Sequence, residues 1–157
     1  TEKKLPSIES ISFRTRNLRD LTITVKERPT LGFIAKDGGY YRIISNGQII
    51  DQKLNSPIGS YPIYSNFSHK RLKQISNIYA KLAKNIQTNI SEIRNAPTKL
   101  NPYRIKIDMN DGNKVIADMR TVQSKLKYYP GMAAQMKKKG VIDLEIGAYS
   151  YPFKDKK

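Results

Sequence analysis

The sequence has no cysteine and no tryptophan, and only one histidine, His69. Without cysteine the chain can form no disulfide, use no thiolate nucleophile and hold no Cys-ligated zinc ion. It also lacks any run of about 18 apolar residues, so no segment is long and apolar enough for a membrane-spanning helix. Cysteine usage leaves the compartment open, because many extracellular proteins of Gram-positive bacteria contain no disulfides.

Residues that could perform catalysis are equally scarce. A hydrolase or transferase needs a nucleophile with a base, a pair of carboxylates or a metal cluster. His69 lies beside Lys70 at the expected start of a helix, which is typical of a solvated first-turn residue. Asp108, Asp111 and Asp118 fall on two strands and their turn, where turn formation and strand-edge solvation account for them. We therefore expect no catalytic site, no metal and no cofactor.

Acidic residues are few relative to basic ones: 13 against 29, a net charge of +16. Such a charge attracts polyanions, and wall polymer, anionic lipid and nucleic acid all qualify, although it can also serve solubility alone. Nucleic acid is disfavoured, because the basic residues are spread along the sequence and no known nucleic-acid-binding signature is present. The one dense basic run, formed by Lys137, Lys138 and Lys139, is a candidate polyanion contact or the cationic end of a helix.

The first fifty residues read as short strands. Apolar and polar residues alternate around Ile11 and Phe13 and again over Leu21–Val25, which is the period of a half-buried strand. Asp37-Gly38-Gly39 and Asn46-Gly47 are hairpin turn sequences. The pattern predicts an antiparallel meander that continues through Ile50.

The remaining sequence mixes helices and strands. The segment 55–67 has two prolines and no period, so we expect an ordered connector; Ser68 is a candidate N-cap for an amphipathic helix that buries Leu72, Ile75, Ile78, Tyr79 and Leu82. Strands are predicted at 90–94, 103–109, 114–118 and 141–146, and helices at 121–129 and 132–138, with an interruption at Pro130-Gly131. The predicted fold is α+β, with a mixed, mostly antiparallel β-sheet and two or three amphipathic helices packed on one face.

Several short motifs are characteristic in their order: Leu5–Phe13, then Leu21-Thr22-Ile23-Thr24-Val25-Lys26-Glu27-Arg28, and later Gly140-Val141-Ile142-Asp143-Leu144-Glu145-Ile146-Gly147. They resemble the extracytoplasmic part of the FtsQ/DivIB family of bacterial cell-division proteins. The first two resemble the end of that family's POTRA module, and the third resembles its closing strand. Gly39-Tyr40-Tyr41, Ser45–Ile50 and the Asn110-Asp111-Gly112 hairpin resemble the passage into the β-domain. Glu145 departs from the Arg that is common in the Gram-negative family members.

The resemblance implies a domain division. Residues 1–50 would be a strand-rich remnant of a POTRA module and the transition into the sheet, 51–153 the β-domain, and 154–157 a charged tail. The POTRA module would begin with an earlier strand and helix that this sequence does not contain, so we expect it to be truncated. The implied localisation is the cell membrane, as a single-pass protein with this region on the extracellular side at the division septum.

The resemblance also implies a non-catalytic scaffold that binds DivIC/FtsB-like and FtsL-like division proteins. A final amphipathic strand at the end of a sheet offers unpaired backbone groups to which a partner segment can add. The candidate partner-binding residues are Val141, Ile142, Asp143, Leu144, Glu145, Ile146, Gly147, Tyr149 and Tyr151. Among them we expect Ile142, Leu144 and Ile146 to anchor the core, and Asp143, Glu145, Tyr149 and Tyr151 to face the partner. The alternative is a basic module that adheres to wall polymer, anionic lipid or nucleic acid.

Overall fold

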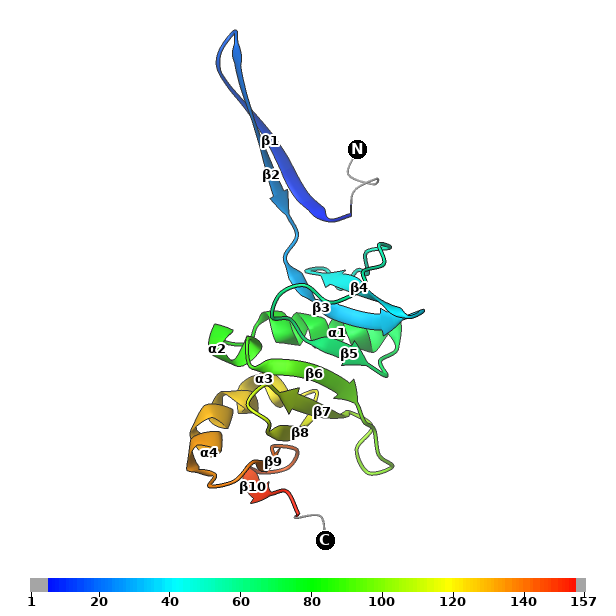
Figure 1. The fold of residues 1–157 in the computed structure, drawn as a ribbon, viewed down its shortest axis with the longest axis vertical. Coiled ribbons are helices and arrows are strands. Elements are labelled where there is room, and N and C mark those ends of the chain that lie inside the picture. Colours follow the sequence, from blue (N-terminus) through cyan, green and yellow to red (C-terminus); the bar gives the residue numbers. More distant parts are fainter. Residues whose placement is uncertain (1–5, 155–157) are drawn as a thin grey trace.

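Two sheets of unequal size organise residues 6–154, which this computed structural model describes (Figure 1). The smaller is a hairpin of β1 (Ile8–Asn17) and β2 (Asp20–Glu27). The larger has eight strands in the order β10-β9-β8-β7-β6-β5-β3-β4. Their bounds are β3 (Thr30–Lys36), β4 (Gly39–Ile44), β5 (Ile63–Ser65), β6 (Ile90–Asn95), β7 (Arg104–Met109), β8 (Lys114–Asp118), β9 (Gly140–Asp143) and β10 (Tyr149–Pro152).

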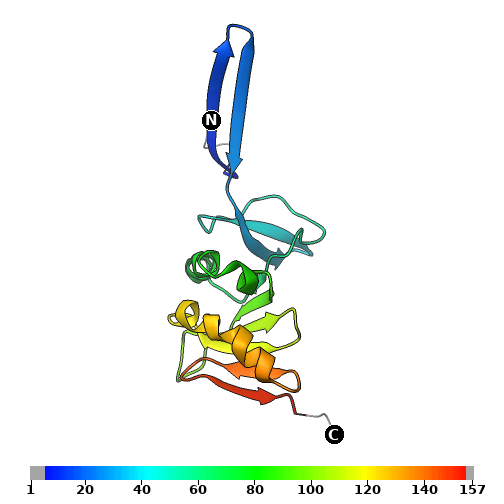
Figure 2. The same ribbon diagram turned by 90° about the vertical axis from the view of Figure 1, so that its left-hand side faces the viewer.

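The helical segments contribute to one hydrophobic core together with the large sheet. They are α1 (His69–Ala80), α2 (Lys84–Gln87), α3 (Val122–Lys125), the 3-10 helix η2 (Leu126–Tyr128) and α4 (Tyr129–Gln135). Figure 2 looks onto this side of the molecule, with α4 crossing in front of the strands. The predicted α+β class, with helices on one face of a mostly antiparallel sheet, is confirmed.

Helix α1 forms where the sequence predicts it. The Ser68 hydroxyl accepts a hydrogen bond from the Arg71 N–H, which satisfies one of the unpaired donors at the helix start. Leu72, Ile75 and Tyr79 lie on the buried stripe. The apolar period of the helix therefore fixes which side lies on the sheet.

The hairpin of β7 and β8 shows the two faces of the sheet most clearly. Ile105 and Ile107 are buried under the helices, whereas Lys106 between them is exposed on the opposite face. The Asp111 carboxylate accepts a hydrogen bond from the Asn113 N–H in the turn, and Gly112 has a positive φ of 91°. The predicted hairpin is thus confirmed, and the helices of residues 6–154 contribute to the core on the side of Ile105 and Ile107, opposite Lys106.

Two local predictions are wrong. The connector at 55–67 contains β5, which lies between β3 and β6 and pairs in parallel with both. A three-residue strand directly after Pro62 is too short to show periodicity, yet Tyr64 is buried and its hydroxyl donates to the Leu31 carbonyl. In addition, Pro130-Gly131 does not interrupt a helix: it lies in the first turn of α4, where proline costs no hydrogen bond.

The hairpin β1–β2 stands apart from the large sheet. It projects beyond the β3 and β4 end of the molecule (Figure 1), and no strand of the large sheet pairs with it among the described residues. The predicted continuous meander through Ile50 is therefore wrong, because the chain changes sheet between Glu27 and Thr30. The start of the large sheet at Thr30 precedes the expected domain boundary at residue 50 by twenty residues.

One face of this hairpin is apolar and exposed. Ile11 lies opposite Val25 and Phe13 opposite Ile23 across the two strands. Phe13 is 68% exposed and Ile23 55%. Within residues 6–154, no helix is long and apolar enough to cross a membrane.

Candidate partner-binding edge of the sheet

The C-terminal edge of the large sheet is formed by β10, not by the strand predicted at 141–146. The closing strand β9 pairs in parallel with β8 on one side and antiparallel with β10 on the other. The prediction that this strand itself forms the rim is wrong, because a further strand of the same chain, β10, pairs with its outer side. Both β9 and β10 lie at one end of the molecule (Figure 1).

The register decides which backbone groups of β10 remain available. Tyr151 lies opposite Val141, and the Phe153 N–H donates to the Lys139 carbonyl at 3.1 Å. Because antiparallel pairs alternate, the backbone groups of Tyr149 and Tyr151 point toward β9, and those of Ser150 and Pro152 point outward. Proline has no N–H, so within β10 Ser150 offers the one outward donor.

Gly140 allows β10 to lie close to β9. A Cβ atom at this position would collide with the Tyr151 carbonyl oxygen and the Pro152 Cα, both of them backbone. The Gly140 N–H points the other way and donates to the Asn113 side-chain oxygen at 3.0 Å. The residue that starts β9 is thus held between β8 and β10.

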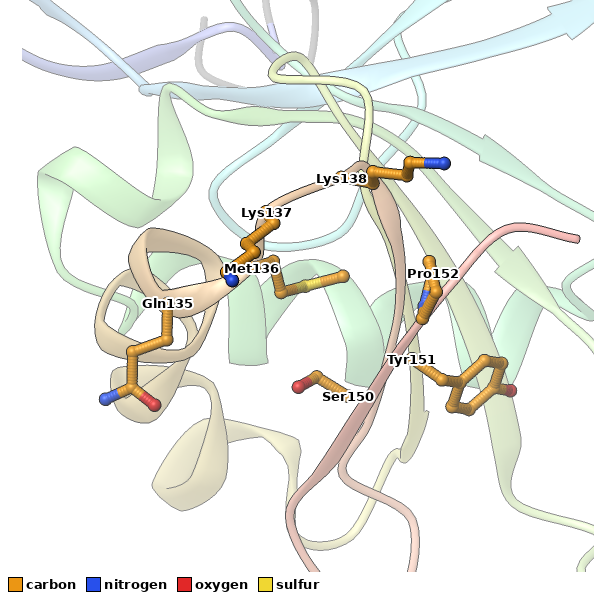
Figure 3. A pocket seen from close by; sticks show the side chains of 7 residues that line it. All are labelled: Gln135, Met136, Lys137, Lys138, Ser150, Tyr151 and Pro152. Carbon is orange, nitrogen blue, oxygen red and sulfur yellow. The ribbon is translucent and has the colours of Figure 1, made fainter. Parts of the chain in front are cut away.

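A groove of about 310 Å³ runs between the end of α4 and β10 (Figure 3). Its lining residues are Gln135, Met136, Lys137, Lys138, Ser150, Tyr151 and Pro152. In Figure 3 the Ser150 side chain points toward the α4 side, whereas the Tyr151 side chain points to the opposite side of the strand. The edge therefore has a groove with a basic rim on its helical side and an exposed tyrosine on its open side.

The turn between β9 and β10 presents an apolar side chain. Ile142 and Leu144 are fully buried, as predicted, but Ile146 is 89% exposed. Ile146 lies beyond the end of β9, and the Lys125 ammonium donates to the carbonyls of Leu144, Glu145 and Ile146. The prediction that Ile146 anchors the core is wrong, since the alternation of the strand ends before it.

Glu145 and Asp143 make contacts within the chain. Asn101 donates to the Glu145 carboxylate at 2.8 Å, and the Arg104 Nε lies 3.7 Å from its other oxygen. The Asp143 carboxylate accepts from the Glu145 N–H at 2.9 Å. Tyr149 and Tyr151, by contrast, are 65% and 47% exposed. Of the four side chains predicted to face a partner, the two tyrosines are therefore the exposed ones.

Asn101 also connects this turn to a buried carboxylate. It donates to Asp118, which accepts a second set of hydrogen bonds from the Arg120 guanidinium. These bonds, from Arg120 above all, lower the pKa of Asp118 to about 2. The interpretation of Asp118 as a solvated strand-edge residue is wrong, because the side chain is buried and paired.

The loop that carries Asn101 ends in a stacked cluster. The guanidinium carbons of Arg71 and Arg120 lie 4.9 and 4.4 Å from the centroid of the Tyr103 ring. At the tip of the same loop Leu100 is 98% exposed. Asn101 donates a hydrogen bond to Glu145. Leu100 precedes Asn101 in the sequence and Ile146 follows Glu145, so each exposed apolar residue adjoins one partner of this bond.

A polar network holds the other end of β9. The Tyr129 hydroxyl lies 2.6 and 2.7 Å from the two oxygens of Asp111, to which it donates. Burial alone would raise the pKa of Asp111, but hydrogen bonds from Tyr129, Asn113 and Asn89 lower it. Burial and the Asp111 carboxylate raise the pKa of Tyr129. Asn113 links this network to the Gly140 N–H, so the network positions the strand that β10 lies on.

The remaining candidates from the sequence lie away from this edge or beside it on the surface. His69 is exposed at the first residue of α1, as predicted. Among residues 6–154, no group of three or more His, Asp or Glu side chains is arranged to hold a metal ion. Lys137, Lys138 and Lys139 are exposed and follow α4. The charged tail at 154–157 lies outside the described residues apart from Lys154.

Comparison with protein families gives a match over most of the large sheet. The family described as "Cell division protein FtsQ/DivIB, C-terminal" matches residues 32–145, which run from β3 to the turn after β9. A solved structure agrees: the major extracytoplasmic domain of DivIB from Geobacillus stearothermophilus aligns with a TM-score of 0.61 and 22% identity, covering 69% of this chain and 93% of that one. At this identity the likeness shows a shared fold. Fold and family match together define a bacterial cell-division protein.

More similar sequences narrow the assignment. DivIB of Lacticaseibacillus rhamnosus is 35% identical over 152 residues, which is 97% of this chain and 54% of that protein. DivIB of Ligilactobacillus salivarius is 41% identical over 130 residues, 82% of this chain and 46% of that protein. The chain therefore belongs to the FtsQ/DivIB family, and it spans about half the length of the curated relatives that it matches.

Proposed function

We propose that this chain is a non-catalytic, extracytoplasmic scaffold of the division machinery, and that a DivIC/FtsB-like or FtsL-like partner adds an extended segment to β10. The observation that carries this proposal is the outward-pointing backbone of Ser150 on an edge strand. A partner residue opposite Ser150 can form both an N–H to O=C and an O=C to H–N bond there. The proposed location is the outer side of the cell membrane, at the septum.

Pairing with β10 has a defined end. Pro152 occupies the next outward position of β10 and has no N–H. A carbonyl of the partner strand that lies opposite Pro152 therefore finds no hydrogen-bond donor there. Few main-chain bonds are available, and the side chains must contribute much of the affinity. Tyr149 and Tyr151, with about half or more of each ring exposed, and the exposed Ile146 supply that surface.

The N-terminal hairpin fits a second part of the proposal. Its exposed apolar face, with Ile11, Phe13 and Ile23, needs cover from other elements, because a two-stranded hairpin is marginal in water by itself. In this proposal the hairpin belongs to a POTRA module, whose other elements lie against that face. The β-domain then begins at β3, where the large sheet begins.

Replacement of Ser150 by proline tests the docking edge. The N–H that Ser150→Pro removes points away from β9, and edge strands accept proline, so β10 should stay in place. Ser150→Ala also loses the hydroxyl but keeps the N–H, and it serves as the matched control. We expect roughly tenfold weaker binding of a DivIC-like ectodomain for Ser150→Pro, the worth of about one hydrogen bond. For Ser150→Ala the affinity should stay within about twofold. Isothermal titration calorimetry measures both, and equal affinities for the two variants would rule out pairing at Ser150.

A further inference from the structure

The charge of this protein is distributed unevenly between its two faces. There is no Asp or Glu between Asp51 and Glu92, nor between Asp118 and Asp143. These two stretches contain α1, α2, α3, η2 and α4, that is, every helix of the described chain. They hold 12 of the 29 basic residues, so the rest of the chain has 17 basic residues against all 13 acidic ones. Most of the excess charge therefore belongs to the helical side.

On the opposite, open face of the sheet, basic residues are paired with acids. Arg94 lies 2.8 Å from Glu92, and Lys114 lies 3.2 Å from Asp108. Because each pair has no net charge, its electric field falls off within a few ångströms and attracts a polyanion little. The open face thus carries charges of both signs, whereas the two stretches that contain the helices contribute no acidic residue.

The exposed cations of the helical face form a ridge along α1. Lys70, Lys73 and Lys81 follow one another at intervals of three and eight residues, which places them on one stripe of the helix spanning about 16 Å. All three side chains are exposed. Lys84 continues the ridge at the start of α2. Further exposed lysines come from the second helical segment: Lys127 lies in η2, and Lys137, Lys138 and Lys139 follow the end of α4.

The chemistry of this ridge selects among polyanions. Lysine contacts phosphate as a point charge, without the fixed geometry of arginine, and the two arginines nearby are stacked on Tyr103. Single-stranded nucleic acid needs a row of exposed aromatic rings, but Tyr128 is the one large exposed aromatic residue on the described helices. An interfacial membrane helix needs an exposed apolar side, whereas α1 buries its own. A flexible phosphodiester chain without bases fits these features best.

We infer that the lysine ridge of α1 binds a linear polyol-phosphate polymer of the cell envelope. This inference uses the extracytoplasmic location proposed above, but it does not use the docking edge. Each phosphate that meets a lysine releases a condensed counterion, so binding weakens as salt rises. The ridge would hold the domain against the wall while β10 remains open to a protein partner.

The test compares two variants of equal net charge. Lys70→Gln/Lys73→Gln/Lys81→Gln removes three charges from the ridge, and Arg14→Gln/Arg16→Gln/Arg19→Gln removes three from the exposed β1–β2 hairpin. Binding of purified poly(glycerol phosphate) is measured by calorimetry from 50 to 200 mM NaCl. For the ridge variant we expect roughly tenfold weaker binding and a salt slope smaller by about 2, since a contact contributes about 0.7. The hairpin variant should retain affinity within about twofold.

The inference would be overturned by equal losses of affinity in the two variants, by tighter binding to a nucleic acid, or by tighter binding to a lipid. Equal losses in the two variants would mean that binding follows net charge and not the ridge. Tighter binding of the unmodified chain to oligo(dT), or to phosphatidylglycerol vesicles, would assign the ridge to nucleic acid or to lipid. Binding of the DivIC-like ectodomain by the ridge variant, measured in parallel, keeps failure of this inference distinct from failure of the docking edge.

Discussion

Truncation of the chain after Gly147 should abolish binding of a DivIC-like ectodomain, with a loss of about a hundredfold or more. The change removes β10, and with it Ser150, Tyr149 and Tyr151. All four residues of β10 are exposed, so the large sheet loses little buried surface. Deletion from Val141 onward would be a poorer test, because Ile142 and Leu144 are fully buried core residues.

The truncation also separates two roles for β10. If β10 builds the docking edge, its removal ends binding. If β10 instead covers a docking edge on β9, its removal frees the backbone groups of Val141 and Asp143, and affinity should rise. Titration of full-length and truncated chains distinguishes these cases. An unchanged far-ultraviolet circular dichroism spectrum, apart from the lost strand, confirms that the truncated chain is folded.

Replacement of Asn113 by alanine should destabilise the fold by about 2–4 kcal/mol. Asn113 is almost fully buried, and its side-chain oxygen is the acceptor for the Gly140 N–H. Alanine leaves that buried donor without a partner and removes the donor to the Tyr129 hydroxyl. A buried polar group left unpaired loses its full solvation, which is why the expected cost exceeds that of an ordinary hydrogen bond.

Asn110→Ala is the matched control for this prediction. Asn110 lies in the same turn but is exposed, and it donates to the Thr88 carbonyl at 3.0 Å. Its loss should cost about 1 kcal/mol or less, because water replaces the bond. Urea unfolding measures both free energies, with an unchanged m-value as the sign of a common unfolding transition. A cost for Asn113→Ala no larger than that of Asn110→Ala would contradict the anchoring of β9 through Asn113.

The parts of the fold that the sequence predicts are those with a long, clear period. Helix α1 has four apolar residues, Leu72, Ile75, Ile78 and Tyr79, at helical spacing, and β7 alternates strictly before a turn rich in Asn and Gly. The missed elements lack such a pattern. β5 has only three residues and directly follows Pro62, and β10 contains Pro152, a residue that sheets accept only on an edge.

Long-range contacts explain the other differences. Arg120 follows Asp118 by two residues, but the sequence does not show that Asp118 is buried, because its other partner, Asn101, lies on a different loop. Glu145 reads as solvent-facing by alternation, yet Asn101 and Arg104 approach it only in the folded chain. The family resemblance predicted a strand within residues 140–147, where β9 lies, but it did not predict that β10 follows and pairs with β9.

The cationic helical face was visible in the sequence by a different signal. The basic residues themselves are spread from one end of the chain to the other, and this argued against a patch. The acidic residues, however, are missing from two long stretches, and the fold brings those stretches to the same side of the sheet. The stretches without acidic residues therefore indicate the cationic face better than the density of basic residues does.

Amide hydrogen exchange of Ser150 tests the central claim most directly, since this N–H is the one outward-pointing donor of β10. In the unbound chain Ser150 should exchange much faster than Tyr149 and Tyr151, whose N–H groups point toward β9. Saturation with the DivIC-like ectodomain should slow Ser150 by roughly tenfold or more and change its two neighbours little. If Ser150 exchanges at the same rate in the saturated complex, the partner does not pair with this edge.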